Sequence, residues 1–342
     1  MTTDLPAAAL ELARVFASGG RLIVAAPDRF DHAQHVAVEF IHPAITGAKS
    51  LPAIAVPFDD IDANLRTDDA LLVLEKLGEP LEPNFPAAAQ VFVIGRALSG
   101  PALVRWYHVL WELVQLGLEH PGLTGGSATS GGDSTSFLYP FLDASESSDA
   151  SLLESSAASW EAKELESEEL CAQTIAANLE SIDAVTSMIR SASENGGTTY
   201  AIGNGGSSCD AARLVRLLTA QDVSARSLAA DTAILTALAN DLGIDKIFAR
   251  QVEAMIRPGD VLVAFSTSGS SSNLLAALDV AARVDARVVI SAGYGGGPMG
   301  SHHAVDQALI VDSTSVHRIQ EAQGVLIDQV CQRLEAQSEV NA

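Results

Sequence analysis

Two segments rich in glycine and hydroxyl side chains could together hold a phosphate. The sequence GNGGSS at residues 203–208 follows a short apolar stretch, and STSGSSSN at residues 266–273 follows another. Glycines let the backbone approach a ligand, and amides at a helix start attract anions. Alone, the first segment could be a tight connection from strand to helix and the second a flexible loop. Because hydroxyls and amides suit a phosphate monoester without lysine, the pair favours a phosphate site.

A histidine and a glutamate four residues apart could provide acid–base chemistry in the N-terminal half. His35 and Glu39 lie within residues 31–41, whose pattern predicts a helix. Residues with this spacing share one face of a helix. The glutamate could act as a base and the histidine as an acid or metal ligand. Such a pair also arises by chance on solvated helix faces, so this alternative stays open.

The elements that must position these residues alternate between strand and helix. Strands are predicted at residues 22–25, 53–56, 91–94, 199–202, 261–265, 288–291 and 309–311, and helices at 31–41, near 69–77, and at 102–118, 160–193 and 274–284. This alternation predicts an α/β fold with doubly wound parallel sheets covered on both faces. In such sheets, ligands bind at the carboxyl ends of the strands, where both candidate phosphate segments lie.

The arrangement of a Gly-Gly pair, a strand, a loop and a helix occurs twice. Gly19-Gly20 begins one copy and Gly196-Gly197 the other, which predicts an internal duplication. A stretch rich in glycine, serine and acidic residues, and therefore low in apolar residues, separates the halves. We therefore expect a degenerate domain at residues 1–120, a linker at 121–159 and an intact domain at 160–342.

The composition limits the classes of partner. The 342 residues contain 20 lysines and arginines against 43 acidic residues, a formal charge of −23. This excess of acid argues against a nucleic acid or an anionic membrane surface as partner. Without a leader pattern or a long apolar run, a cytoplasmic location is expected. The three cysteines, Cys171, Cys209 and Cys331, form no CxxC pair and are interpreted as small apolar side chains. His302 and His303, after a glycine-rich segment, are interpreted as surface histidines.

Several motifs in the C-terminal half resemble the SIS (sugar isomerase) domain family, and within it the phosphoheptose isomerases. They are AIGNGGSSCDA at residues 201–211, LAND at 238–241, GDVL at 259–262, STSG at 266–269 and RIQE at 318–321. The similarity extends from about residue 164 to 334. It implies an SIS-type αβα sandwich and a ketose–aldose isomerisation of sedoheptulose 7-phosphate through an enediol. The residues that the resemblance places on phosphate or sugar are Asn204, Ser207, Asp231, Ser266, Thr267, Ser268 and Ser271.

The catalytic positions depart from the family. Its His-x-x-x-Glu pair falls here on Arg213 and Leu217, its glutamine on Gln320, and its last histidine on Asp328. In the degenerate copy, APDRF at residues 26–30 replaces the glycine-rich loop, whereas His35 and Glu39 match the missing pair after a one-residue deletion.

Two functions remain open. One is an isomerase with a composite site between the domains, in which Glu39 is the base, His35 binds a metal or orients the substrate, and Gln320 and Asp328 assist. Zinc is then a candidate cofactor, held by His35, Glu39 and Gln320. The other is a phosphosugar sensor or interaction scaffold without catalysis. The resemblance also implies a homodimer of two-domain chains and a heptose phosphate ligand, although a hexose or pentose phosphate would suit the same loops.

Overall fold

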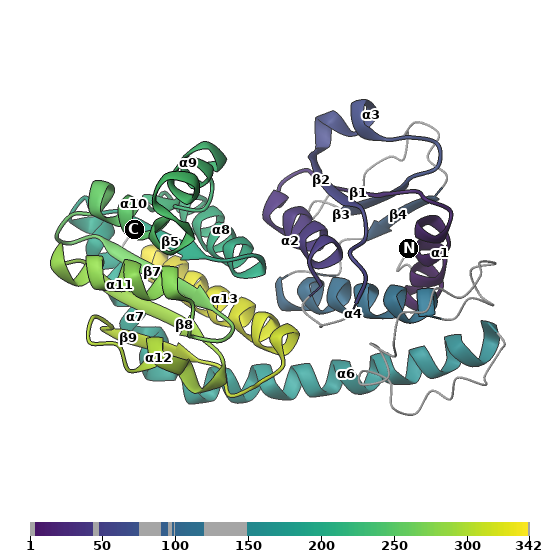
Figure 1. The fold of residues 1–342 in the computed structure, drawn as a ribbon. Helices are drawn as coiled ribbons and strands as arrows, with labels where there is room; N and C mark the ends of the chain where they lie inside the picture. The colour runs from purple at the N-terminus through teal and green to yellow at the C-terminus, as the bar shows by residue number, and fades with distance from the viewer. Residues whose placement is uncertain are drawn as a thin grey trace. The chain divides into compact units, whose positions relative to one another are not determined.

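The computed structural model describes residues 4–43, 48–74, 90–94, 98, 100–119 and 149–340. The chain divides into two compact units, Met1–Glu166 (unit 1) and Ser167–Ala342 (unit 2), each considered by itself below. Each unit contains a parallel sheet flanked by helices (Figure 1). This confirms the α/β fold class.

Unit 1 is built on a four-stranded parallel sheet of order β2-β1-β3-β4. Its elements are α1 (Leu5–Ala17), β1 (Leu22–Ala26), α2 (Phe30–Ile41), β2 (Ala53–Pro57), η1 (Phe58–Asp60), α3 (Ile61–Asn64), β3 (Ala70–Leu74), β4 (Gln90–Ile94) and α4 (Gly100–Glu119). The larger apolar cluster joins one face of the sheet to α1, α2 and α4. A smaller cluster covers the other face, with Ile61 at the start of α3.

The helix predicted near residues 69–77 is wrong, because residues 70–74 form strand β3. All five side chains of Ala70–Leu74 are buried, and the strand pairs with both β1 and β4. A central parallel strand is covered on both faces and therefore shows no alternation of polar and apolar residues. Such a short apolar run cannot be told from a buried helix by periodicity alone.

Unit 2 contains a five-stranded parallel sheet of order β6-β5-β7-β8-β9. Its strands are β5 (Thr199–Gly203), β6 (Ala225–Ser227), β7 (Val261–Ser266), β8 (Arg287–Ala292) and β9 (Gln307–Ile310). Its helices are α7 (Leu179–Glu194), α8 (Gly206–Thr219), α9 (Thr232–Leu242), η2 (Ile244–Lys246), α10 (Ala249–Met255), α11 (Ser272–Arg283), η3 (Tyr294–Gly296), α12 (Gly297–Gly300) and α13 (Val316–Val340). One apolar cluster joins the sheet to α7, α8 and α13, and another joins it to α10 and α11.

The helix predicted at residues 160–193 is divided in two. Helix α6 (Asp149–Ala177) ends before Asn178, and α7 begins after it. The Asn178 side-chain amide donates to the Ile310 carbonyl and accepts from the Ile310 amide, each at 2.9 Å. The interruption therefore places an amide side chain on the backbone of edge strand β9. Of the predicted linker, residues 121–148 lie outside the described residues, and 149–159 belong to α6.

The turns that lead into β1 and β5 make equivalent backbone hydrogen bonds. Gly20 donates its amide to the Val15 carbonyl, and Gly197 donates to that of Ala192. A Cβ on Gly20 would lie 2.1 Å from the carbonyl oxygen of Asp68, and one on Gly197 would lie 2.9 Å from that of Gly259. Only glycine fits at both positions, which explains the second glycine of each pair, and the positive φ angles of Gly19 and Gly196 explain the first.

An aspartate comes directly after each residue whose carbonyl oxygen makes this close contact. Asp69 accepts hydrogen bonds from the amides of Arg66 and Arg21, and Asp260 accepts them from those of Arg257 and Thr198. Each carboxylate thus joins the beginning of the sheet's first strand to the strand beside it. With the shared strand order, these bonds fit two copies of one fold.

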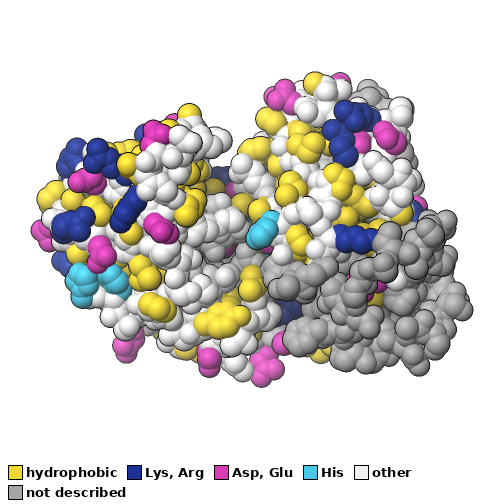
Figure 2. Space-filling model, in the orientation of Figure 1, with side chains coloured by type: hydrophobic (Ala, Val, Ile, Leu, Met, Phe, Trp, Pro, Cys, Tyr) yellow, Lys and Arg dark blue, Asp and Glu magenta, His cyan; other side chains and the backbone are white. Residues whose placement is uncertain are grey.

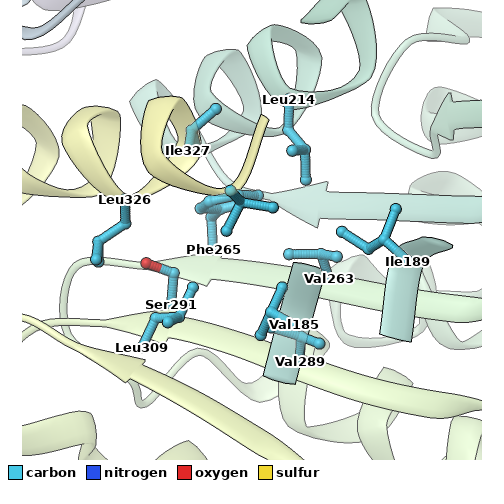
Figure 3. A pocket seen from close by; sticks show the side chains of 11 residues that line it. Val185, Ile189, Leu214, Val263, Phe265, Val289, Ser291, Leu309, Leu326 and Ile327 are labelled. Atoms are coloured by element: carbon cyan, nitrogen blue, oxygen red, sulfur yellow. The ribbon is translucent and has the colours of Figure 1, made fainter. Parts of the chain in front are cut away.

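A small cavity of about 20 Å³ lies in the core of unit 2, between the sheet and the helices on one face (Figure 3). Apolar side chains such as Val263 and Leu326 line it, and Ser291 is a polar member of the lining. Its volume suits about one water molecule and is far too small for a sugar phosphate.

The described surface mixes the side-chain types. On the face shown in Figure 2, acidic and basic side chains are interspersed with apolar ones. Within the described residues, every helix is too short or too polar to cross a lipid bilayer.

Candidate functional site

The first candidate phosphate loop connects β5 to α8. Ser207 is the second residue of α8, and its side chain is buried. Its backbone amide donates to the Asn204 carbonyl at 3.0 Å, which folds residues 204–207 into a tight turn. The loop therefore ends at a helix N-terminus, where the positive end of the helix dipole favours an anion.

The second loop connects β7 to α11 and is ordered by its own hydroxyls. The Gly269 amide donates to Ser266 Oγ at 2.9 Å, and Ser268 Oγ lies 2.9 Å from Ser270 Oγ. Thr267, Ser268 and Ser271 are only half-buried. These hydroxyls thus lie at the start of α11, within reach of a ligand from solvent.

Two asparagines join the loops. The Asn204 side-chain amide donates to Asn273 Oδ1 at 3.0 Å, and that of Asn273 donates back to Asn204 Oδ1 at 2.9 Å. Since β5 and β7 are neighbouring parallel strands, both loops leave the same edge of the sheet. The structure therefore brings Ser207 and the hydroxyls of residues 266–271 to one edge, as the sequence predicted. Asn273 was not singled out, although it ends the hydroxyl-rich run.

Asp231 follows β6, the strand on the other side of β5. It caps helix α9, and its Oδ1 accepts the Ile234 amide at 3.0 Å. The side chain is exposed. One carboxylate oxygen thus has a structural partner, while the residue remains accessible near the sheet edge.

In unit 2, an ion pair occupies two positions that the resemblance assigns to catalytic histidines. The Arg213 guanidinium on α8 lies 2.5 Å from the Asp328 carboxylate on α13 and donates to the Gly324 carbonyl at 3.0 Å. Leu217 packs against the apolar core. Gln320 lies buried on α13. Unit 2 therefore has both candidate phosphate loops, whereas Arg213, Asp328 and Leu217 are engaged in charge pairing and packing.

Cys331 lies on α13, close to this ion pair. Burial raises the pKa of its thiol to about 12, and the Asp328 carboxylate adds to the shift. The thiol therefore stays protonated at neutral pH and is no nucleophile.

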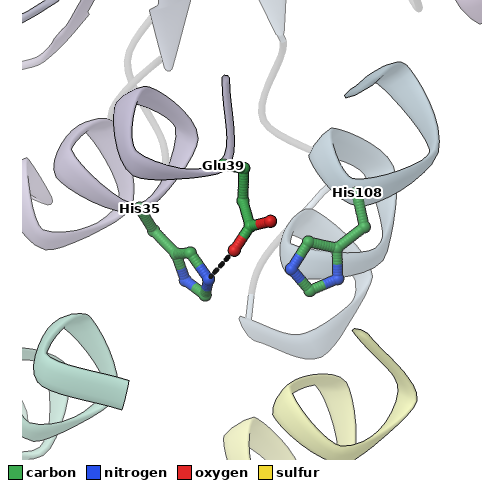
Figure 4. A group of neighbouring side chains, drawn as sticks. All are labelled: His35, Glu39 and His108. Atoms are coloured by element: carbon green, nitrogen blue, oxygen red, sulfur yellow. Dashed lines mark ion pairs between the residues drawn. The ribbon is translucent and has the colours of Figure 1, made fainter. Parts of the chain in front are cut away.

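Unit 1 contains a buried group of two histidines and a glutamate. His35 and Glu39 lie on α2 and His108 on α4, and one ligand atom of each lies within 4.8 Å of the others (Figure 4). His35 Nε2 is 3.4 Å from Glu39 Oε1. The Tyr107 hydroxyl lies 2.8 Å from His35 Nδ1. The predicted pair thus shares a face of α2, and that face is buried.

This group has the donor set of a catalytic zinc site. Two histidines and a glutamate bind zinc in several hydrolytic enzymes, with a fourth position left for water or substrate. A hydrogen bond to the second ring nitrogen, such as that between Tyr107 and His35, orients a metal-bound imidazole. Sequence reasoning missed His108, because its partners lie on another helix far away along the chain.

In unit 1, the segment that connects β1 to α2 differs from the glycine-rich loop that connects β5 to α8 in unit 2. Arg29 is buried and donates to the Leu98 carbonyl at 3.2 Å. The side chain of Arg29 also lies 3.9 Å from Asp28. An arginine thus lies between β1 and α2, whereas glycine and serine residues lie between β5 and α8 in unit 2.

Comparison with known proteins identifies relatives of unit 2. Residues 165–292 match the model of the SIS domain family. The phosphoheptose isomerase of Bordetella avium is 38% identical over 176 residues, covering 49% of this chain and 88% of that relative. The phosphoheptose isomerase of Helicobacter pylori strain Shi470 is 42% identical over 148 residues, covering 42% of this chain and 76% of that relative.

Solved structures extend the likeness. The phosphoheptose isomerase from Neisseria gonorrhoeae has a TM-score of 0.50 at 33% identity and covers 51% of this chain and 96% of that chain. The C-terminal domain of glucosamine-fructose-6-phosphate aminotransferase from Francisella tularensis has a TM-score of 0.59 and covers 97% of this chain and 92% of its own. At 11% identity it shows the fold alone. Through its C-terminal half, the chain belongs to the SIS domain family and is related to the phosphoheptose isomerases.

Proposed function

We propose that this protein is an aldose–ketose isomerase acting on a phosphorylated sugar, with sedoheptulose 7-phosphate as the first substrate to test. The observation that carries the proposal is the pair of loops joined by Asn204 and Asn273, in the unit related to phosphoheptose isomerases. Ser207, Ser266, Thr267, Ser268 and Ser271 would hold the phosphate, and Asn204 and Asp231 the sugar. In this proposal, the loops anchor one end of the substrate and leave its carbonyl end to the catalytic groups.

The base in this proposal is Glu39. Isomerisation moves a proton between two neighbouring carbons through an enediol, so a base must take the proton from one carbon and return it to the other. His35, His108 and one carboxylate oxygen of Glu39 would hold zinc, whose contribution would be to polarise the carbonyl oxygen, and the other oxygen of Glu39 would act as the base. These three residues belong to unit 1 and the candidate phosphate loops belong to unit 2, so the proposed site is composite. Gln320 and Asp328 are proposed only to assist, and the pairing of Asp328 with Arg213 already engages that carboxylate.

The test is turnover of sedoheptulose 7-phosphate by the zinc-loaded protein, with the aldose product followed by NMR. Glu39→Gln should abolish turnover and leave phosphosugar binding intact, whereas Ser268→Ala should weaken binding. Glu11→Gln on α1 and Ser301→Ala on the surface are matched controls. Full activity of Glu39→Gln would remove Glu39 as the base. Faster turnover of a hexose or pentose phosphate would change the substrate and keep the site.

A second function is favoured by the Arg213–Asp328 ion pair. It fills positions assigned to catalytic groups, and Leu217 cannot accept a proton. A sensor that binds phosphosugars without converting them would need only the loops of unit 2. Protection from thermal unfolding by sedoheptulose 7-phosphate, without any product in the NMR assay, would support this function over catalysis.

A further inference from the structure

A second group of metal-ligating side chains lies on unit 2, away from the phosphate loops. Asp279 on α11 and His302 and His303, which follow α12, have ligand atoms within 4.8 Å of one another. His302 Nε2 lies 3.3 Å from Asp279 Oδ1, and the two imidazole rings stack with centroids 4.5 Å apart. The group therefore joins two separate elements.

We propose that Asp279, His302 and His303 form a site for a zinc-class divalent ion, and that the bound ion restrains the Ser266–Ser271 loop. Two imidazoles and one carboxylate are ligands that Zn²⁺ and its neighbours in the transition series accept. The His302 side chain is 13% exposed and that of Asp279 is 54% exposed, so water would complete the coordination. The site is independent of the proposed isomerase activity.

Coordination through Nε2 would require a change of tautomer at His302. Its Nδ1 accepts a hydrogen bond from the Ala304 amide at 3.3 Å, which places the ring proton on Nε2, facing Asp279. Binding an ion through Nε2 moves this proton to Nδ1, and no proton is released. The bond that is lost is long, and it belongs to a half-exposed residue, Ala304.

The two elements that the ion would join also frame the Ser266–Ser271 loop. Helix α11 begins directly after this loop. The segment before the histidines packs onto it, because the Met299 amide donates to the Gly269 carbonyl at 2.9 Å. The contact is close, since a Cβ on Gly269 would lie 2.1 Å from the Gly296 carbonyl oxygen. An ion bound by Asp279 and the histidines would thus close a ring of contacts that includes Gly269 of the loop.

The test uses the full chain and ZnCl₂ alone, with calorimetry for stoichiometry and hydrogen exchange for the loop. His303→Asn should lose one equivalent of Zn²⁺ relative to the wild type, and His42→Asn, at an exposed histidine in unit 1, should lose none. Saturating Zn²⁺ should slow amide exchange in peptides covering residues 266–271 and 293–300 of the wild type but not of His303→Asn.

His35→Asn separates this site from the group in unit 1. It should lose its own equivalent of Zn²⁺ and keep the slower exchange in the loop, whatever the outcome for isomerase activity. Equal Zn²⁺ stoichiometry in wild type and His303→Asn would overturn the proposal, as would loop exchange that saturating Zn²⁺ leaves unchanged.

Discussion

The contact between Tyr107 and His35 is the residue-scale feature with the clearest chemical consequence. The Tyr107 hydroxyl lies 2.8 Å from His35 Nδ1, and both side chains are buried. If the phenol oxygen accepts a hydrogen bond from Nδ1–H, the lone pair of Nε2, which lies 3.4 Å from Glu39 Oε1, is available to an ion. Tyr107 is thus a positioning residue for the proposed zinc group.

Tyr107→Phe should therefore weaken Zn²⁺ binding at His35, Glu39 and His108 by about 10–100-fold, the usual effect of removing a partner of a metal-bound histidine. The measurement is a competition titration with a chromophoric chelator. Tyr294→Phe, which removes an exposed hydroxyl from unit 2, is the matched control. Equal affinities of the two variants would contradict the role of Tyr107.

The residues of the two sites differ in how far the sequence could predict them. His35 and Glu39 follow from a helical spacing, and the hydroxyl loops follow from their place after apolar strands. His108 could not be found, because its meeting with α2 depends on how α4 packs. The contact of Arg213 with Asp328 was also not predicted, although each position had been identified, since two helices must cross to form it.

At the scale of elements, ion pairs and hydrogen bonds of charged side chains connect helices and strands to one another. Arg213→Met, which removes the link between α8 and α13, should lower the free energy of unfolding by about 2–3 kcal/mol. This lies below the usual cost of breaking a fully buried ion pair, because Asp328 is 26% exposed. Urea denaturation gives the value. Arg216→Met, on the same helix but half-exposed, should change it by less than half as much, and similar losses for both variants would argue against the ion pair.

Asp69 fastens β1 to β3, and its effect depends on pH. Burial alone would raise the pKa of this carboxyl, but hydrogen bonds from the Arg21 side chain and from the amides of Arg66 and Arg21 outweigh burial and lower it. A lowered pKa stabilises the folded state above the unfolded pKa of about 3.9, and this contribution is lost as the pH falls through the folded pKa.

We therefore expect Asp69→Asn to reduce the free energy of unfolding by about 2 kcal/mol at neutral pH. The difference from the wild type should narrow below about pH 4, where the carboxyl begins to take up a proton in the unfolded state, and should vanish below the lowered pKa of the folded state. Asp68→Asn, at the exposed neighbour, should show no such convergence. Urea titrations at a series of pH values measure both, and a difference that stays constant to the lowest pH would refute the assignment.

At the scale of the whole molecule, each unit has its own apolar clusters. Gly20→Ala would force a Cβ to within 2.1 Å of the Asp68 carbonyl oxygen, so it should destabilise unit 1 by roughly 1–3 kcal/mol or more. On heating, the Gly20→Ala variant should first lose the Zn²⁺ ion bound at the His35 group of unit 1. Phosphosugar binding by unit 2 should persist to a higher temperature. Gly197→Ala is the reciprocal control, and loss of both functions together in either variant would show that the units unfold as one.

The paired glycines and aspartates also bear on how such a chain can be rebuilt by recombination. Gly20 and Gly197 occupy the same place in the backbone bonding of their units, and so do Asp69 and Asp260. A crossover that joins the segment before one glycine to the segment after the other leaves each glycine and each aspartate with backbone partners of the same kind. Chimeras cut here would therefore exchange the helix that precedes each sheet, α1 or α7, and leave the described strands of each sheet together.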